Sequence, residues 1–338
     1  MDLNLNILKI LTLSFLLNLL LFYNLDKISK LLKAYDFPDN YRKIHVKVIP
    51  LVGGYIFLIN FIFLILFDLS LNNKLFLEYY KFLSLREIII FTLASLSIYL
   101  VGLFDDKFSI EPLKRLLLLT LIIYIFLLFS NGSILERINI KIVNFSFSFG
   151  EEKLIFTVIC VISLINILNF YDGINLELIF YCLLIFVYLF LKSHNEYFLF
   201  LIVPLSLLCI YNFKNKLFLG DGGSYLLGFV ISVFLLKTYN TGYVTDAAEI
   251  FAILSLPFFD FCRVIIKRII SSKKFYEPDK SHFHHVLIDN FGVSKAVIFM
   301  SIINLLVFFV LYFNYYLAIL FSFFIIFLGE LFFKKIAK

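Results

Sequence analysis

The run "AVIFMSIINLLVFFVLYF", Ala296–Phe313, has 18 residues and no charged side chain. A helix needs about 20 mostly apolar residues to cross the hydrocarbon core of a bilayer, so this run is typical of a membrane span. Similar apolar runs recur along the whole chain of 338 residues. The mean hydropathy of +0.97 and the 16% share of charged residues exclude an ordinary soluble globular protein.

The pattern predicts an all-α fold, a polytopic membrane helical bundle in which residues 1–338 form a single integral membrane domain. Eleven spans are predicted, with ten as the alternative because some runs are short. They lie near residues 5–23, 49–67, 88–104, 115–130, 154–168, 176–191, 197–211, 222–237, 248–266, 296–313 and 315–333. Within residues 130–153, the alternating stretch "INIKIVNFSFSF" indicates short strands.

The distribution of basic residues predicts the orientation of the bundle. If the N-terminus lies outside, the cytoplasmic segments hold 21 of the 30 lysines and arginines. Cytoplasmic loops of membrane proteins carry such an excess of Lys and Arg, so we expect the N-terminus outside and the C-terminus in the cytoplasm. The first run, Met1–Asn24, lacks a basic n-region and a small-residue cleavage site, so we expect it to be retained as a span.

Acidic and amide side chains stand at the ends of several predicted spans on the cytoplasmic side. Asp105 and Asp106 end the third span, Asn169 and Asp172 follow the fifth, and Asp221 precedes the eighth. Each motif alone is often a solvated helix end or a turn. Their recurrence on one face of a chain so poor in charge predicts a shared site at the membrane surface.

The residue types at this face favour phosphate chemistry assisted by a metal. Carboxylate and amide oxygens suit Mg²⁺, which binds a few carboxylates together with phosphate oxygens. The glycines around Asp221 would let the backbone approach a ligand closely, and the helix that starts there offers amide donors to a phosphate. Nearby basic residues are placed to bind anions: Lys107, Lys114 and Arg115.

Three of the five histidines, His282, His284 and His285, lie in the polar stretch "EPDKSHFHHVL", Glu277–Leu287. A zinc site, a structural loop and a contact to a phosphate substrate are the three interpretations. His282 and His285 can share a helical face, but no cysteine or third ligand nearby completes a tetrahedral zinc site. We favour hydrogen-bond donors to a phosphate substrate, with partial positive charge because imidazole titrates near neutral pH.

Five motifs together resemble a known family, the polyprenyl-phosphate N-acetylhexosamine-1-phosphate transferases of glycosyltransferase family 4. In chain order they read "HVKVIPLVGG", "GLFDDKFSIEPLKR", "NILNFYDGIN", "FLGDGGSYLLGF" and "EPDKSHFHH". The resemblance is closer to the bacterial branch that charges undecaprenyl phosphate with GlcNAc-1-phosphate. It implies transfer of a HexNAc-1-phosphate from a UDP-sugar to the lipid phosphate with release of UMP. The product would start an O-antigen or another cell-envelope polysaccharide.

The resemblance also implies roles for individual residues. Asp221 and Asn169 would hold Mg²⁺, with Mn²⁺ as an alternative. Asp105, Asp106 and Asp172 would be catalytic, with Asp105 as the base or only as a positioning group. The residues that would bind substrate are Lys114, Asn175, His45, His282, His284 and His285. The expected partners are a UDP-N-acetylhexosamine, undecaprenyl phosphate, the lipid bilayer of the bacterial inner membrane and a second copy of the chain, with no nucleic acid.

Two departures and two alternatives accompany this interpretation. The family pattern commonly reads Asp-Gly-x-Asp-Gly-Leu where this chain has "DGINLE", so Asn175 replaces an acid and Leu176 a glycine. Other donors are therefore alternatives: UDP-N-acetylfucosamine, UDP-bacillosamine or UDP-MurNAc-pentapeptide. A secondary transporter would need ionisable groups near the bilayer midplane. The sequence offers mainly Asp260, which we predict to pair with Arg263.

Overall fold

The computed structural model describes residues 2–38, 47–70, 85–195, 197–271 and 281–336. His45 and the first four residues of the "EPDKSHFHH" motif lie outside these ranges. In the first half of the described chain the helices are α1 (Asp2–Tyr23), α2 (Leu25–Leu32), α3 (Gly53–Ser70), α5 (Leu85–Phe108), α6 (Pro112–Phe129) and α7 (Lys153–Phe170). In the second half they are α8 (Glu177–Ser193), α9 (Tyr197–Phe213), α10 (Gly220–Asn240), α11 (Ala247–Ile270), α12 (Phe283–Phe291), α13 (Val293–Phe313) and α14 (Tyr315–Ile336).

Each predicted span coincides with one of these helices, because a helix satisfies its own backbone hydrogen bonds in lipid. By length and composition, six helices of the described chain can cross a membrane: α3, α5, α6, α7, α10 and α13. The pair α1 and α2, bent by 67°, would be a seventh. The structure therefore confirms a helical membrane protein, and the count of eleven spans stays a prediction.

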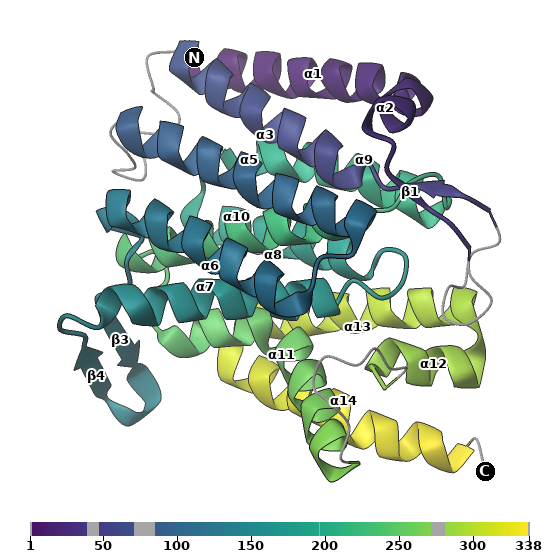
Figure 1. The fold of residues 1–338 in the computed structure, drawn as a ribbon. Helices are drawn as coiled ribbons and strands as arrows, with labels where there is room; N and C mark the ends of the chain where they lie inside the picture. The colour runs from purple at the N-terminus through teal and green to yellow at the C-terminus, as the bar shows by residue number, and fades with distance from the viewer. Residues whose placement is uncertain (1, 39–46, 71–84, 196, 272–280, 337–338) are drawn as a thin grey trace.

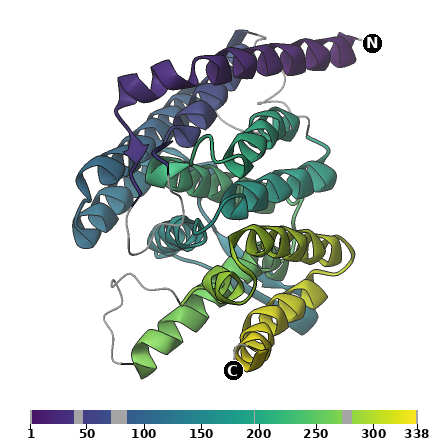
Figure 2. The same cartoon turned by 90° about the vertical axis from the view of Figure 1, so that its right-hand side faces the viewer.

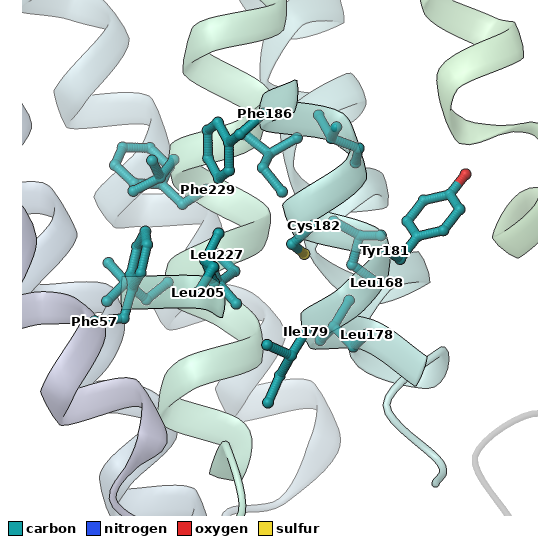
Figure 3. Close-up of a cluster of buried hydrophobic side chains, with 14 of the residues drawn as sticks. Phe57, Leu168, Leu178, Ile179, Tyr181, Cys182, Phe186, Leu205, Leu227 and Phe229 are labelled. Carbon is teal, nitrogen blue, oxygen red and sulfur yellow. The ribbon is translucent and has the colours of Figure 1, made fainter. Parts of the chain in front are cut away.

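The helix α10 lies at the centre of the bundle (Figures 1 and 2). It packs against α5, α7, α3 and α8. Its apolar side chains, such as Leu227 and Phe229, meet Phe57 of α3, Cys182 of α8 and Leu205 of α9 in one buried cluster (Figure 3). Asp221, which the sequence predicts to hold a metal ion, is in the first turn of this central helix. The most buried helix of the fold thus carries the site at one of its ends.

Close helix packing explains two of the glycines that follow Asp221. A Cβ atom on Gly102 of α5 would lie 2.4 Å from the Cα of Gly222, and one on Gly54 of α3 would lie 2.4 Å from the Cα of Gly223. The expectation that these glycines let a ligand approach the backbone is therefore wrong for Gly222 and Gly223. Their missing side chains let α3 and α5 touch α10, which brings the ends of three helices together.

Two short hairpins occupy opposite ends of the bundle. Strands β1 (Tyr35–Asp36) and β2 (Ile49–Pro50) pair at the right-hand end in Figure 1. Strands β3 (Arg137–Ile140) and β4 (Phe145–Ser148) pair at the left-hand end, which confirms the strands expected within residues 130–153. The short 3₁₀ turns are η1 (Asn131–Ser133) and η2 (Lys141–Val143).

A buried pair of amides joins α1 to α3. The side-chain nitrogen of Asn18 donates to the oxygen of Asn60 at 2.7 Å, and Asn60 returns the bond at 3.0 Å. We expect Asn18→Ala to lower the stability of the protein by about 1 kcal/mol, because Asn60 then loses its partner in an apolar setting. Thermal unfolding in lipid discs measures this. The double variant Asn18→Leu and Asn60→Leu should recover part of the loss, and a fully additive loss would contradict the pairing.

Candidate active site

The described parts of all five motifs meet at one end of the bundle, the side that carries α12 and the C-terminal end of α5 in Figure 1. The described part of the first motif contributes backbone bonds. Gly53 N–H donates to the carbonyl oxygen of Phe218 at 2.9 Å, Gly54 N–H to that of Leu219 at 3.1 Å, and Phe218 N–H to that of Pro50 at 2.8 Å. The segment just before Asp221 is therefore held by the motif that begins α3.

Asp106 caps the first turn of α10. Its carboxylate accepts hydrogen bonds from the backbone N–H of Asp221 at 2.9 Å and of Gly222 at 3.3 Å. The first amides of a helix have no partner within the helix, and a negative charge there is further stabilised by the helix dipole. Gly220 makes the approach possible, because its φ is +75° and a Cβ atom would lie 2.7 Å from Asp106 Oδ2. Asp106 thus joins the end of α5 to the start of α10.

Asp105 is buried, and both of its oxygens have partners. Oδ1 accepts from the backbone N–H of Ile110 at 2.9 Å. Oδ2 accepts from the guanidinium of Arg115 at 2.7 Å and from the hydroxyl of Tyr225 at 3.0 Å. The charge of Arg115 compensates the cost of burying this carboxylate. Asp105 is therefore fixed in place by α6 and α10.

Asp221 and Asn169 are brought together as expected. The amide nitrogen of Asn169 donates to Asp221 Oδ1 at 2.9 Å and to the hydroxyl of Ser224 at 2.8 Å. Asp105 reaches the same end of α10 through its bond to Tyr225, one turn after Asp221. Three acidic side chains, Asp105, Asp106 and Asp221, therefore lie at one end of α10, and Arg115 pairs with the first of them.

Asp172 lies between this acidic cluster and the histidines. The residue is exposed at the surface of this region. Desolvation, together with repulsion from Asp221 and Glu177, raises the pKa of Asp172 to about 8. The next residue, Gly173, lies directly against His284, because a Cβ atom on it would be 2.0 Å from Cε1 of the imidazole. The loop after α7 therefore joins the acids to the histidines.

The predicted pair of Asp260 and Arg263 is confirmed, and it anchors the histidine segment. Asp260 Oδ1 accepts from Arg263 at 2.6 Å. It also accepts, at 3.0 Å, from the backbone N–H of Phe283, which is the first residue of α12. Its Oδ2 is 2.8 Å from Nδ1 of His282. Arg263 also donates to Glu330 of α14 at 2.7 Å. An acid of α11 therefore caps α12, as Asp106 caps α10.

His284 is buried, and its ring is held by a glutamate. Its Nδ1 lies 3.2 Å from Oε1 and 3.0 Å from Oε2 of Glu177, the first residue of α8. Burial, and to a smaller extent the charge of Arg263, lowers the pKa of His284 to about 4. The ring is neutral at pH 7, so the partial positive charge expected of these histidines does not hold for His284.

The three histidine rings lie next to one another. The rings of His282 and His284 lie 5.5 Å apart and nearly parallel, and those of His284 and His285 lie 4.4 Å apart and tilted by 57°. Among the described residues, no three His, Cys, Asp or Glu side chains group as ligands of a metal ion. Because His282 and His284 each bond a carboxylate through Nδ1, their positions follow from hydrogen bonding within the protein.

Two predicted substrate residues stand apart from the acids. Lys114 is exposed and pairs with Glu111 at 3.1 Å. Asn175, which stands where the family pattern has an acid, donates to the side chain of Asn215 at 2.7 Å. This bond joins the loop after α7 to the loop after α9. Leu176, where the family pattern has glycine, takes a left-handed φ of +66° that glycine adopts without strain.

Sequence reasoning missed two residues of this region and gave a third a different partner. Arg115 was expected to bind anions but pairs with Asp105, and Tyr225 was not considered. Tyr225 lies four residues after Asp221, a helical spacing that the sequence does show. Glu177 was also missed, although a charged residue at the start of an apolar helix is a signal.

Removing the Asp260 carboxylate should destabilise the protein. We expect Asp260→Ala to cost about 3 kcal/mol, the lower end of the range for losing one partner of a buried ion pair, because Glu330 still pairs with Arg263. Thermal unfolding of the purified protein measures the loss, and Glu136→Ala at an exposed ion pair is the control. Equal stability of the two variants would contradict the anchoring role of Asp260.

Comparison with known proteins places these motifs in a family. Residues 88–239, which include Asp105, Asp172 and Asp221, match the family model of glycosyl transferase family 4. The chain is 29% identical over 280 residues to a probable undecaprenyl-phosphate N-acetylglucosaminyl 1-phosphate transferase of Bacillus subtilis, covering 78% of this chain and 72% of that protein.

Undecaprenyl-phosphate alpha-N-acetylglucosaminyl 1-phosphate transferases of two other bacteria are also similar. The protein of Haemophilus influenzae is 26% identical over 74% of this chain and 70% of its own length. The protein of Thermotoga maritima is 27% identical over 83% of this chain and 82% of its own length. The order of the motifs, their meeting at one end of the bundle and these similarities agree, and over residues 88–239 the chain resembles glycosyl transferase family 4.

Proposed function

We propose that this protein transfers a HexNAc-1-phosphate, with GlcNAc-1-phosphate as the leading candidate, from a UDP-sugar to undecaprenyl phosphate and releases UMP. The observation that carries the proposal is the meeting of Asp105, Asp106, Asn169 and Asp221 at one end of the bundle. An acidic site at helix ends can receive both a soluble nucleotide-sugar and a phosphate on a membrane lipid. The similar proteins are named for this reaction.

Mg²⁺, or Mn²⁺ in its place, fits the residues present. Asp221 and Asn169 would hold it, since they supply oxygen atoms and lie beside each other, and Asp106 adds a carboxyl group at the same helix end. Few protein ligands are expected at such a site, because Mg²⁺ usually takes its remaining ligands from water and substrate phosphates. When bound, the metal would neutralise charge on the transferred phosphoryl group.

The side chains of the site then have separate tasks. Asp105 accepts from Ile110, Arg115 and Tyr225, so it is suited to position its neighbours and poorly placed to take a proton from the substrate. Asp106 sets the start of α10 and with it the place of Asp221. The exposed Lys114 is available to attract the anionic substrates, although Glu111 reduces its net charge.

The setting of the enzyme follows from the same proposal. The protein would lie in the bacterial inner membrane with its N-terminus in the periplasm, and the active site would face the cytoplasm, where UDP-sugars occur. The start of α1 and the end of α14 lie at opposite ends of the bundle in Figure 1, which supports this orientation. A role in O-antigen or another cell-envelope polysaccharide and a homodimer remain predictions.

The test is an assay of UMP release with purified protein, undecaprenyl phosphate, Mg²⁺ and a panel of UDP-sugars. We expect turnover with UDP-GlcNAc that chelation by EDTA abolishes and added Mg²⁺ restores. Turnover only with UDP-N-acetylfucosamine, UDP-bacillosamine or UDP-MurNAc-pentapeptide would replace the donor and keep the reaction. Absence of UMP with every sugar would overturn the proposed function.

A further inference from the structure

The Glu177 carboxyl group connects two loops that belong to different motifs. Its side chain is 1% exposed, so a carboxyl group here needs hydrogen-bond partners. The backbone N–H of Ile174 donates to Oε2 at 3.3 Å. The other partner is Nδ1 of His284, 107 residues away in the chain. One buried group therefore holds both the loop after α7 and the histidine segment.

The contact with Glu177 fixes the orientation of the His284 ring. Nδ1 lies 3.2 Å from Oε1 and 3.0 Å from Oε2 of the carboxyl group. The other nitrogen, Nε2, faces the loop, because a Cβ atom on Gly173 would lie 2.2 Å from it. The ring therefore fills the space beside Gly173 in one orientation. A carboxylate partner fixes the orientation of many functional histidines in this way.

This contact sets the spacing of the residues proposed to bind the nucleotide-sugar. Asp172 precedes Gly173, and Asn175 follows Ile174, both within the loop that Glu177 holds. His282 stacks on His284, and His285 contacts the His284 ring at a tilt. A shift of the His284 ring would therefore move the two sides of this region relative to each other. The acids at α5 and α10 have their own partners and would stay in place.

We propose that Glu177 is a positioning residue for the nucleotide-sugar, acting through His284 to hold the loop at residues 172–175 against the histidine segment. The inference rests on the proposed function, since the UDP-sugar is the ligand that these two segments would share. It gives Glu177 no direct contact with substrate. It predicts an effect on the donor that is separate from any effect on the lipid acceptor.

The first experiment measures KM for both substrates with UDP-GlcNAc, undecaprenyl phosphate and purified Glu177→Gln protein. We expect KM for UDP-GlcNAc to rise about tenfold, while KM for undecaprenyl phosphate stays within about twofold, because positioning errors of this kind weaken one site selectively. Glu249→Gln is the matched control, since Glu249 is another buried glutamate, paired with Tyr188 and Lys192 at the opposite end of the bundle. An equal rise in both KM values, or none, would overturn the proposal.

A second variant covers the case in which Glu177→Gln does not fold. Gly173→Ala leaves Glu177 intact and pushes a methyl group against the His284 ring, so we expect the same selective rise in KM for UDP-GlcNAc. Unchanged KM for UDP-GlcNAc in folded Gly173→Ala protein would contradict the proposal. Wild-type protein that releases no UMP with any donor would instead contradict the proposed function, so the two failures are distinguishable.

A double-mutant cycle tests whether Glu177 acts through His284. We expect Glu177→Gln combined with His284→Asn to raise KM for UDP-GlcNAc no further than the larger of the two single effects, because both substitutions break one contact. Effects that multiply would show that Glu177 does not act through His284.

Discussion

Asp221→Asn is expected to lower the rate of UMP release by about a thousandfold or more, to the background of the assay, because the metal would lose its one charged ligand in the proposed site. The substitution keeps the size of the side chain. Asparagine can still bond Asn169 after rotation of its amide, so the fold should persist. UMP release at saturating Mg²⁺ measures the loss of activity, and thermal unfolding checks the fold.

The matched control for this prediction is Asp289→Asn. Asp289 lies on α12, at the same end of the bundle, and its side chain is exposed. We expect its activity to stay within about twofold of the wild type, as most exposed substitutions have small effects. Near-normal turnover of Asp221→Asn would refute the assignment of Asp221 to the metal.

Asp106→Ala is expected to affect both stability and activity, because Asp106 bonds the first amides of α10. Loss of a helix cap costs about 1 kcal/mol of stability. The loss of activity should be larger, about a hundredfold, since α10 carries Asp221 and a small displacement of a catalytic group lowers the rate strongly. Thermal unfolding and UMP release measure the two effects on the same protein.

The variant Asp106→Asn distinguishes the capping role of Asp106 from the role of its charge, because asparagine keeps an oxygen that can cap the helix and removes the charge. Asparagine caps helices about as well as aspartate, so this variant should unfold close to the wild-type temperature. If the charge of Asp106 contributes to catalysis, the activity should stay about as low as that of Asp106→Ala. Full activity of Asp106→Asn would show that Asp106 acts only as a cap.

Helix positions and the face of the site were predictable from local sequence. Apolar runs indicated the helices because a bilayer demands a minimum apolar length, and the alternating stretch near Phe145 indicated the β3–β4 hairpin. The grouping of Asp105, Asn169 and Asp221 followed from their common place at the ends of predicted spans. The pair of Asp260 and Arg263 followed from helical spacing.

Individual partners in the site were not predictable in this way. The glycines after Asp221 were assigned to ligand approach, whereas Gly222 and Gly223 contact α5 and α3. Arg115 was treated as a free cation, whereas it pairs with Asp105. In each case the residue type was informative and the partner was not, since a charge or a small residue suits several contacts.

The sequence by itself indicated the helical membrane fold, the grouping of acidic and amide side chains at one end of the bundle and the resemblance to a transferase family, because apolar length, helical spacing and motif order are properties of neighbouring residues. Only the tertiary structure decided that Asp106 caps α10, that Tyr225 bonds Asp105 and that Glu177 holds His284. These partners lie 115, 120 and 107 residues apart in the chain. The packing of helices around α10 brings them together, and no local pattern records which side chains then meet.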